Sequence, residues 1–482
     1  MNPLHCIIPV PVSLTEREGS FPLRQLRGFT LENGCPAFTE AALGRLARWL
    51  TLEWRPVDAG ELRVGLDPSL PGEGWTIEIV PTGVRVTGAD AAGLRYALDA
   101  LAQMLHAAAA EGPLAAQLPC GRIEDAPRFA WRGLLLDSAR HFQRAETVKA
   151  VLRLMPHFRL NRLHWHLIDS QGFRLPLPSF PKARDIAGMS GGQYTASELR
   201  EIGELASECG VEIVPELDCP GHSGGLLRMY PEYACDPAHP GEELCLGNPR
   251  TMEMVKTLYR EAMELLPQGK WLHVGGDEAS TAHWEACPKC QAAIRAQGLS
   301  GARHLEHRFM AELKRFVREE LGRQPISWTI PENTQGRFPL EFPPEDLMQS
   351  WNDLREPVFW AQRGHRVIYS LHYSLYLDYP RNYSETHLSW MFHVGDEQIY
   401  LCEPCGVWPE LVRDAIIGTE ACLWTETVPE WRVMPKLLPR LPAYSECCWS
   451  RPERKEWHDF ARRKEMLEAA GYYEFLRRDA TC

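Results

Sequence analysis

The segment Trp271-Leu272-His273-Val274-Gly275-Gly276-Asp277-Glu278 reads as a buried strand that runs into two consecutive carboxylates. A near-continuous apolar run is typical of a strand whose two faces are both covered. The two glycines let the backbone bend, or let another group approach closely, just before the acids. Two buried neighbouring carboxylates repel each other, so the pKa of one should rise and leave a protonated acid beside a carboxylate. A general acid that works near neutral pH needs such a raised pKa.

Seven further segments resemble this strand, and amphipathic helical patterns over 147–158, 196–209, 252–266 and 305–321 lie between some of them. The eight predicted strands are 133–137, 162–169, 211–217, 271–278, 325–329, 346–351, 366–371 and 416–424. Strands that alternate with helices indicate an α/β fold, either a (β/α)₈ TIM barrel or a doubly wound open sheet. The count of eight strands over roughly 320 residues favours the barrel.

The N-terminal part of the chain has a different texture. Residues 74–80 and 83–88 read as paired strands around a Pro-Thr-Gly turn, and residues 91–110 are rich in Ala and Leu with helical spacing. We therefore expect a small α+β accessory domain over residues 1–127. The barrel catalytic domain, with helices at its C-terminal end, should cover residues 128–482.

Composition narrows the classes of function. The chain has 482 residues, with 52 Lys and Arg against 64 Asp and Glu, so its formal net charge is −12. This acidic balance argues against a nucleic-acid partner, because phosphate binding needs clustered Lys and Arg. No apolar stretch approaches the roughly 18 residues of a membrane span, and the N-terminus lacks the basic start of a secretory signal. We therefore expect a cytoplasmic protein without a membrane partner, in which most of the 15 cysteines are reduced thiols.

Active groups of a (β/α)₈ barrel lie at the carboxyl ends of its strands. Carboxylates and tryptophans occupy nearly every predicted strand end of this chain. The side chains found there are Asp137, His164, Trp165, His166, Asp169, Glu216, Asp218, Asp277, Glu278, Trp328, Trp351, Tyr373, Tyr376, Trp424 and Glu426. Such a set is typical of a pocket that stacks a sugar ring and hydrogen-bonds its hydroxyl groups.

The adjacent acids bear on the mechanism. Ordinary retaining glycosidases hold two carboxyl groups about 5–5.5 Å apart across the scissile bond. Neighbouring residues at one strand end are poorly placed to flank a substrate in that way. They suit one acid and one partner for a nearby substrate group, as in a substrate-assisted reaction in which the 2-acetamido oxygen of the sugar is the nucleophile.

Longer motifs carry a resemblance. They are Trp131-Arg132-Gly133, Arg140-His141-Phe142, Asn161-Arg162-Leu163-His164-Trp165-His166-Leu167-Ile168-Asp169, Pro215-Glu216-Leu217-Asp218-Cys219-Pro220-Gly221-His222, His273–Glu278, Tyr376-Leu377-Asp378 and Leu423-Trp424-Thr425-Glu426. In these motifs, and in their order, residues from about 128 to 450 resemble glycoside hydrolase family 20, the β-N-acetylhexosaminidases. The first part of the chain resembles that family's accessory domain, mainly through residues 93–105.

The resemblance implies an exo-acting, retaining β-N-acetylhexosaminidase. It would hydrolyse terminal non-reducing β-linked GlcNAc or GalNAc by the substrate-assisted, oxazolinium mechanism, with no cofactor and no metal ion. Its partner would be a glycan or oligosaccharide that contains N-acetylhexosamine, and a homodimer is compatible with this interpretation.

The resemblance also implies roles for single residues. Glu278 would protonate the leaving oxygen and then activate water, Asp277 would orient the acetamido group, and Tyr376 would donate a hydrogen bond to its oxygen. Further substrate contacts, or support for the acid pair, are implied for Arg132, Asp169, His222, Trp328, Trp351, Asp378, Trp424 and Glu426.

Two other functions stay open at this point. His164 and His166 share one face of a strand. Together with Asp169, His222 and Asp277 they could serve a metal-dependent barrel hydrolase. The chain could instead be a catalytically weak sugar-binding barrel protein, although the presence of both acids and of a candidate tyrosine argues against that.

The cysteines leave a separate question. Residues 287–290 and 402–405 are both Cys-x-x-Cys segments, and two such pairs can form a structural zinc site if they meet in space. They follow strands that are not neighbours in the expected barrel, so free thiols are the favoured interpretation. Cys235 and Cys245 flank a loop rich in Pro and Gly and could form a local disulfide in an oxidising compartment.

Overall fold

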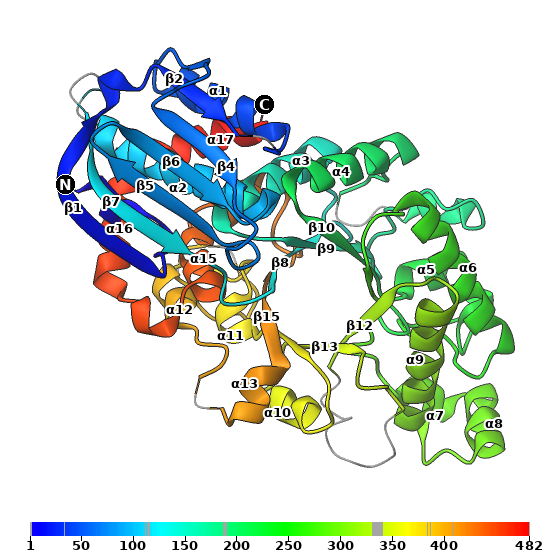
Figure 1. Cartoon of the computed structure of the whole chain (residues 1–482). Helices are drawn as coiled ribbons and strands as arrows, with labels where there is room; N and C mark the ends of the chain where they lie inside the picture. The colour runs from blue at the N-terminus through cyan, green and yellow to red at the C-terminus, as the bar shows by residue number, and fades with distance from the viewer. Residues whose placement is uncertain are drawn as a thin grey trace.

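The computed structural model describes residues 2–481 except 33, 111, 113–115, 187–189, 330–340, 383, 386 and 407. The chain forms a seven-stranded sheet from its N-terminal part and a closed eight-stranded barrel after it (Figure 1). The barrel strands are all parallel and begin with the hydrogen-bonded pair β8 and β9. The prediction of a (β/α)₈ barrel preceded by a small α+β domain is thus confirmed.

The N-terminal sheet has the strand order β1-β7-β5-β6-β4-β2-β3. Its strands are β1 Ser13–Pro22, β2 Gly28–Leu31, β3 Arg55–Pro56, β4 Leu62–Leu66, β5 Trp75–Val80, β6 Gly83–Gly88 and β7 Gln117–Asp125. Helix α1 spans Phe38–Trp49, and α2 spans Ala91–Ala109. Asp90 caps the N-terminus of α2, because its carboxylate accepts a hydrogen bond from the amide of Gly93 at 2.8 Å, and the helix packs against β5 and β6.

The barrel closes in the order β10-β11-β12-β13-β14-β15-β8-β9. Its strands are β8 Trp131–Asp137, β9 Arg162–Ile168, β10 Glu212–Leu217, β11 Trp271–His273, β12 Gln324–Trp328, β13 Leu347–Ser350, β14 Val367–Tyr369 and β15 Ile416–Leu423. Each strand lies where the sequence predicts one. Side chains fill the interior, so the barrel is a packed core and not a pore.

Helices cover the outside of the barrel and continue beyond it. They are α3 Ala145–Leu154, α4 Ala196–Cys209, α5 Gly224–Met229, α6 Pro249–Leu265, α7 Ala282–Ala286, α8 Pro288–Gln297, α9 Ala302–Glu319, α10 Arg355–Ala361, α11 His372–Leu375, α12 Asp396–Leu401, α13 Glu410–Ala415, α14 Val433–Leu437, α15 Leu441–Trp449, α16 Trp457–Ala469 and α17 Tyr472–Thr481. Within the described ranges, no helix has the length and apolar character needed to cross a membrane.

Buried polar contacts join the sheet domain to the barrel. Asp99 of α2 accepts hydrogen bonds from Arg159 at 2.7 Å and from His157 at 2.6 Å, both just before β9. Asp125 at the end of β7 accepts a hydrogen bond from the indole of Trp449 at 2.9 Å. Because burial without partners would be costly for these charges, the contacts favour one relative position of the two units.

The largest difference from the predicted strands is at β11, which is five residues shorter than expected. Strand β11 ends at His273 and not at Glu278, because the backbone turns into the left-handed region at Gly275 (φ +65°) and Gly276 (φ +97°). Asp277 and Glu278 therefore belong to the loop after β11. The glycines that the sequence analysis noted are the physical reason for this early end.

Candidate active site

The loop after β11 presents the acid pair at the carboxyl end of the barrel. A Cβ atom at Gly275 would lie 1.7 Å from Oδ1 of Asp218, so only glycine fits between the strands at this point. The amide of Gly276 donates a hydrogen bond to the same oxygen at 3.1 Å. Glu278 also has a positive φ of +52°, which is uncommon for a residue with a side chain, and strained backbone of this kind tends to cluster at functional sites.

The two acids have different environments. The side chain of Asp277 is 13% exposed, and burial raises its pKa to about 6. The side chain of Glu278 is 58% exposed, and its interaction with His222 lowers its pKa. The sequence analysis expected a raised pKa for one acid of the pair, and in the structure that acid is Asp277.

Side chains of alternating charge extend from Glu278 through His222 and Asp169 to Arg140. Nε2 of His222 lies 3.6 Å from the carboxylate of Glu278, and Nδ1 of His222 lies 3.5 Å from Oδ2 of Asp169. The same oxygen of Asp169 forms an ion pair with Arg140 at 2.8 Å. Burial opposes the charged form of His222, but Asp169 outweighs it and raises the pKa of His222 well above its usual range. His222 is therefore a cation that faces both acids of the pair.

Aromatic rings form one wall. Trp328 is buried, its indole donates a hydrogen bond to Glu216 at 2.7 Å, and its ring lies 5.9 Å from that of Trp424. The ring of Tyr376 lies 6.2 Å from that of Trp424. Trp351 is half-buried, and its indole donates to the carbonyl of Thr329. The structure thus brings the three predicted tryptophans and the predicted tyrosine to one end of the barrel.

Three buried carboxylate oxygens of the predicted site have no hydrogen-bond partner among the described residues. They are Oδ1 of Asp277, Oδ1 of Asp378 and Oε2 of Glu426. Burial raises the pKa of Asp378 and of Glu426, and the proximity of Glu426 raises that of Asp378 further. Buried acceptors without partners are costly, so their convergence at one site indicates a ligand that supplies hydrogen-bond donors.

The prediction for Arg132 is wrong. This residue lies at the amino end of β8, is fully buried, and donates to the carbonyls of Phe129 and Arg159 at 2.6 Å each. It also forms an ion pair with Glu73 of the sheet domain. Arg132 therefore joins the two domains at the end of the barrel opposite to the acids, and cannot contact a ligand there.

The arginine of the site is Arg140, three residues after β8 ends. Besides Asp169 it contacts Nε2 of His166 at 3.2 Å, and its guanidinium lies 5.0 Å from the ring of Trp424. Asp137, the last residue of β8, accepts the amides of Ala139 and Arg140 and fixes this turn. The rule that strand ends carry the chemistry would have selected Arg140, since Arg132 is at the wrong end of the strand.

Below the site, a polar network fills the barrel interior. Glu216 contacts His164 at 3.1 Å and His273 at 3.0 Å, and it also binds His166. Within the site itself, His222, Asp277 and Glu278 offer ligand atoms within 4.8 Å of one another, which is the spacing that a metal-dependent hydrolase would need. His164, His166, His222 and His273 each face a carboxylate of the protein, so these carboxylates and histidines are already partners of one another.

Comparison with known proteins fits this geometry. A model of "Glycosyl hydrolase family 20, catalytic domain" matches residues 129–452, and a model of "Glycosyl hydrolase family 20, domain 2" matches residues 5–126. The chain belongs to glycosyl hydrolase family 20. It is a glycoside hydrolase, and the resemblance seen in its motifs is confirmed.

Relatives of this family 20 hydrolase match nearly its whole length. A beta-N-acetylhexosaminidase of Cellulomonas fimi is 30% identical, over 95% of this chain and 92% of the relative. A beta-hexosaminidase of Akkermansia muciniphila is 28% identical, over 92% of this chain and 93% of the relative. The solved structure of a beta-N-acetylhexosaminidase from Streptomyces coelicolor has a TM-score of 0.81 at 27% identity, over 98% of this chain and 97% of that one.

Proposed function

We propose that this family 20 hydrolase is an exo-acting, retaining β-N-acetylhexosaminidase that removes terminal β-linked GlcNAc or GalNAc with the substrate's own acetamido group as nucleophile. The observation that carries the proposal is the pair Asp277 and Glu278. One acid is buried with an oxygen that has no partner among the described residues, and the other is exposed beside a cationic histidine. Such a pair can act on two adjacent groups of one sugar.

Sugar binding uses the groups around the acid pair. Arg140, Asp378 and Glu426 supply one donor and two acceptors for hydroxyl groups, and the latter two have buried oxygens that need donors. The half-buried Trp424 offers an apolar face to the ring and to the acetamido methyl group, and the buried Trp328 packs beside it. Asp277 accepts the acetamido N–H, and the hydroxyl of Tyr376 donates to the acetamido oxygen.

In the first step the acetamido oxygen attacks C1. The bond from C1 to the leaving oxygen breaks, and that oxygen takes the proton of Glu278. Asp277 stabilises the positive charge that develops on the nitrogen side of the oxazolinium ring. A bound substrate covers the exposed Glu278 side chain and excludes water from it, which disfavours the carboxylate and raises its pKa toward that of a general acid.

In the second step water attacks C1 from the face that the aglycone left. Glu278, now a carboxylate, takes a proton from that water, and the C1–oxygen bond of the oxazolinium ring breaks. Two inversions at C1 give net retention of the β configuration. His222, which Asp169 holds in place, stabilises the negative charge of Glu278 whenever Glu278 is a carboxylate.

The proposal is tested with p-nitrophenyl β-glycosides of GlcNAc, GalNAc and glucose, each with and without EDTA. Turnover of the two acetamido sugars alone, unaffected by EDTA, is expected. Equal turnover of the glucoside would mean that the nucleophile belongs to the protein. Immediate loss of activity with EDTA would favour the metal-dependent alternative, and binding without any turnover would favour a sugar-binding protein.

A further inference from the structure

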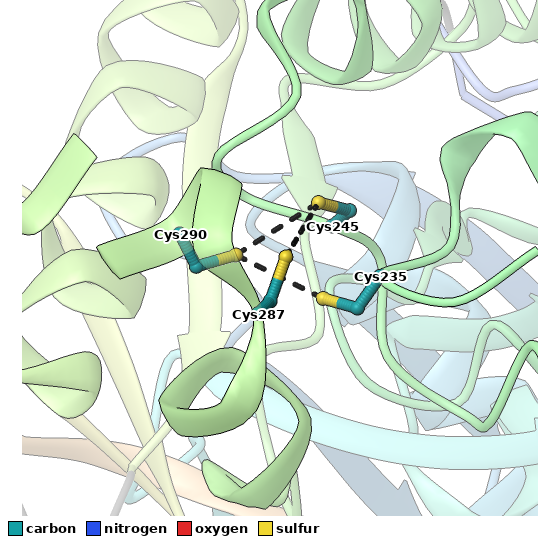
Figure 2. A group of neighbouring side chains, drawn as sticks. All are labelled: Cys235, Cys245, Cys287 and Cys290. Carbon is teal, nitrogen blue, oxygen red and sulfur yellow. Dashed lines mark hydrogen bonds between the residues drawn. The ribbon is translucent and has the colours of Figure 1, made fainter. Parts of the chain in front are cut away.

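Four cysteines lie together outside the active site. Cys235 and Cys245 come from the loop between α5 and α6, and Cys287 and Cys290 from the start of α8 (Figure 2). Three Sγ–Sγ distances are 3.8 Å: Cys235–Cys290, Cys245–Cys287 and Cys245–Cys290. All four sulfur atoms lie within 4.8 Å of one another.

These distances match a tetrathiolate metal site. Four sulfur atoms at the corners of a tetrahedron, each about 2.3 Å from a central Zn²⁺, are about 3.8 Å apart. A disulfide would instead bring one pair of sulfurs to about 2.05 Å. We propose that Cys235, Cys245, Cys287 and Cys290 bind one structural Zn²⁺.

The surroundings favour thiolates. Cys287 precedes the first residue of α8 and Cys290 lies in its first turn, where the helix dipole and free amide groups stabilise negative charge. The amide of Gly247 donates a hydrogen bond to Sγ of Cys290 at 3.3 Å. A Cβ atom at Gly247 would lie 2.2 Å from the carbonyl carbon of Lys289, so a glycine is needed for this close approach.

An apolar shell encloses the cluster. Cys245, Cys287 and Cys290 are buried in one group with Ala279, Trp284, Ile294, Ala302 and Leu305, and Cys235 is half-buried beside them. Four protonated thiols would be weak hydrogen-bond partners for one another in such a place. Four protein thiolates complete the coordination of Zn²⁺ and leave no position for water, so the ion would have a structural role and not a catalytic one.

The pairing differs from the one that the sequence analysis considered. Cys287 and Cys290 do not meet Cys402 and Cys405, since the neighbour of Cys402 is Cys447. Nor are Cys235 and Cys245 joined by a disulfide, because both are free thiols. The loops after β10 and β11 bring the four cysteines together.

The ion would connect two loops of the active site. Next to Cys245, the amide of Leu244 donates to the carbonyl of Pro220 at 2.9 Å, two residues before His222. On the other side, Glu243 accepts the amide of Ser280 at 3.1 Å, two residues after Glu278. A metal ion at the base of both loops would therefore hold the histidine and the acid at their mutual distance.

The test measures metal on the full-length chain, independently of activity. Elemental analysis of protein purified with reductant from zinc-supplemented cells should find about one Zn²⁺ per chain. The double variant Cys287→Ser/Cys290→Ser should lose this zinc and unfold at a lower temperature. The matched control Cys402→Ser/Cys405→Ser changes the other Cys-x-x-Cys pair and should keep the zinc.

A second measurement uses the wild-type chain, so it tests the proposal even if the double variant fails to fold. Exchange of the wild-type ion for Co²⁺ should give the visible absorption of tetrahedral thiolate-bound cobalt, and a mercurial that blocks thiols should release the ion. A chain without stoichiometric zinc, or with disulfides or four alkylatable thiols among these cysteines after zinc addition, would overturn the proposal. Iron at this position would overturn the choice of ion. A zinc-bound chain that turns over no acetamido sugar would overturn the proposed function alone.

Discussion

Replacing Asp277 by Asn should stabilise the protein while it removes activity. The carboxyl group is buried, one of its oxygens has no partner among the described residues, and burial raises its pKa from 3.8 to about 6. The fold therefore opposes the ionised form that we propose for catalysis. An amide of the same shape has no charge to bury.

The magnitude follows from the pKa. One pKa unit corresponds to about 1.4 kcal/mol, so the rise to about 6 corresponds to about 3 kcal/mol at pH values above both. Because the folded chain holds this proton more tightly than the unfolded chain, wild-type stability falls as pH rises from about 4 to about 6. The Asn variant does not lose stability in this way, because its amide does not ionise. Its advantage should be about 3 kcal/mol near pH 8 and close to zero near pH 4.

Thermal unfolding at the two pH values measures the effect. With an unfolding entropy of about 2.1 cal/mol/K per residue, the advantage near pH 8 corresponds to about 3 °C if the chain unfolds as one unit. Asp58→Asn, a change at an exposed carboxylate, is the control and should show no such gain. A variant that is less stable than the wild type near pH 8, or a gain of equal size near pH 4, would refute the reasoning about burial.

Three further results are expected. Glu278→Gln should lose most turnover of substrates with poor leaving groups and less of those with good ones, because only the former need its proton; equal losses would exclude a general acid. Arg140→Met should raise KM for GlcNAc glycosides by a large factor and destabilise the chain by about 3–5 kcal/mol, since it removes the guanidinium that pairs with the buried Asp169, whereas Arg132→Met should lower the unfolding temperature without changing KM. The wild-type kcat/KM should rise with pH through an apparent pKa near 6, as Asp277 and the ionisable groups that interact with it lose a proton. If kcat/KM fell only below about pH 5, the titration would belong to another group.

The sequence predicted the barrel well because its strands are covered on both faces. Such strands read as apolar runs, and all eight lie where those runs occur. The end of β11 was placed too late, since periodicity does not register a change of φ at Gly275 and Gly276. Local backbone conformation at consecutive glycines is set by what approaches them, here the carboxylate of Asp218.

The two errors of the site analysis have different origins. Arg132 was chosen from a motif, although its position at the amino end of β8 already placed it far from the acid pair. Arg140, three residues after the end of β8, is the arginine that the rule about strand ends selects. The cysteine cluster could not be predicted from spacing. Its members are up to 55 residues apart in sequence, and their contact depends on how two long loops fold against each other.

The most direct test of the substrate-assisted mechanism changes the acetamido group of the substrate. p-Nitrophenyl β-glucosaminides are prepared with N-acetyl, N-fluoroacetyl, N-difluoroacetyl and N-trifluoroacetyl groups, and kcat/KM is measured for each with the wild-type enzyme. Each fluorine makes the carbonyl oxygen a poorer nucleophile, so the account predicts a steep, progressive fall in rate along the series. A rate that is indifferent to fluorine would contradict it, and would mean that a group of the protein attacks C1.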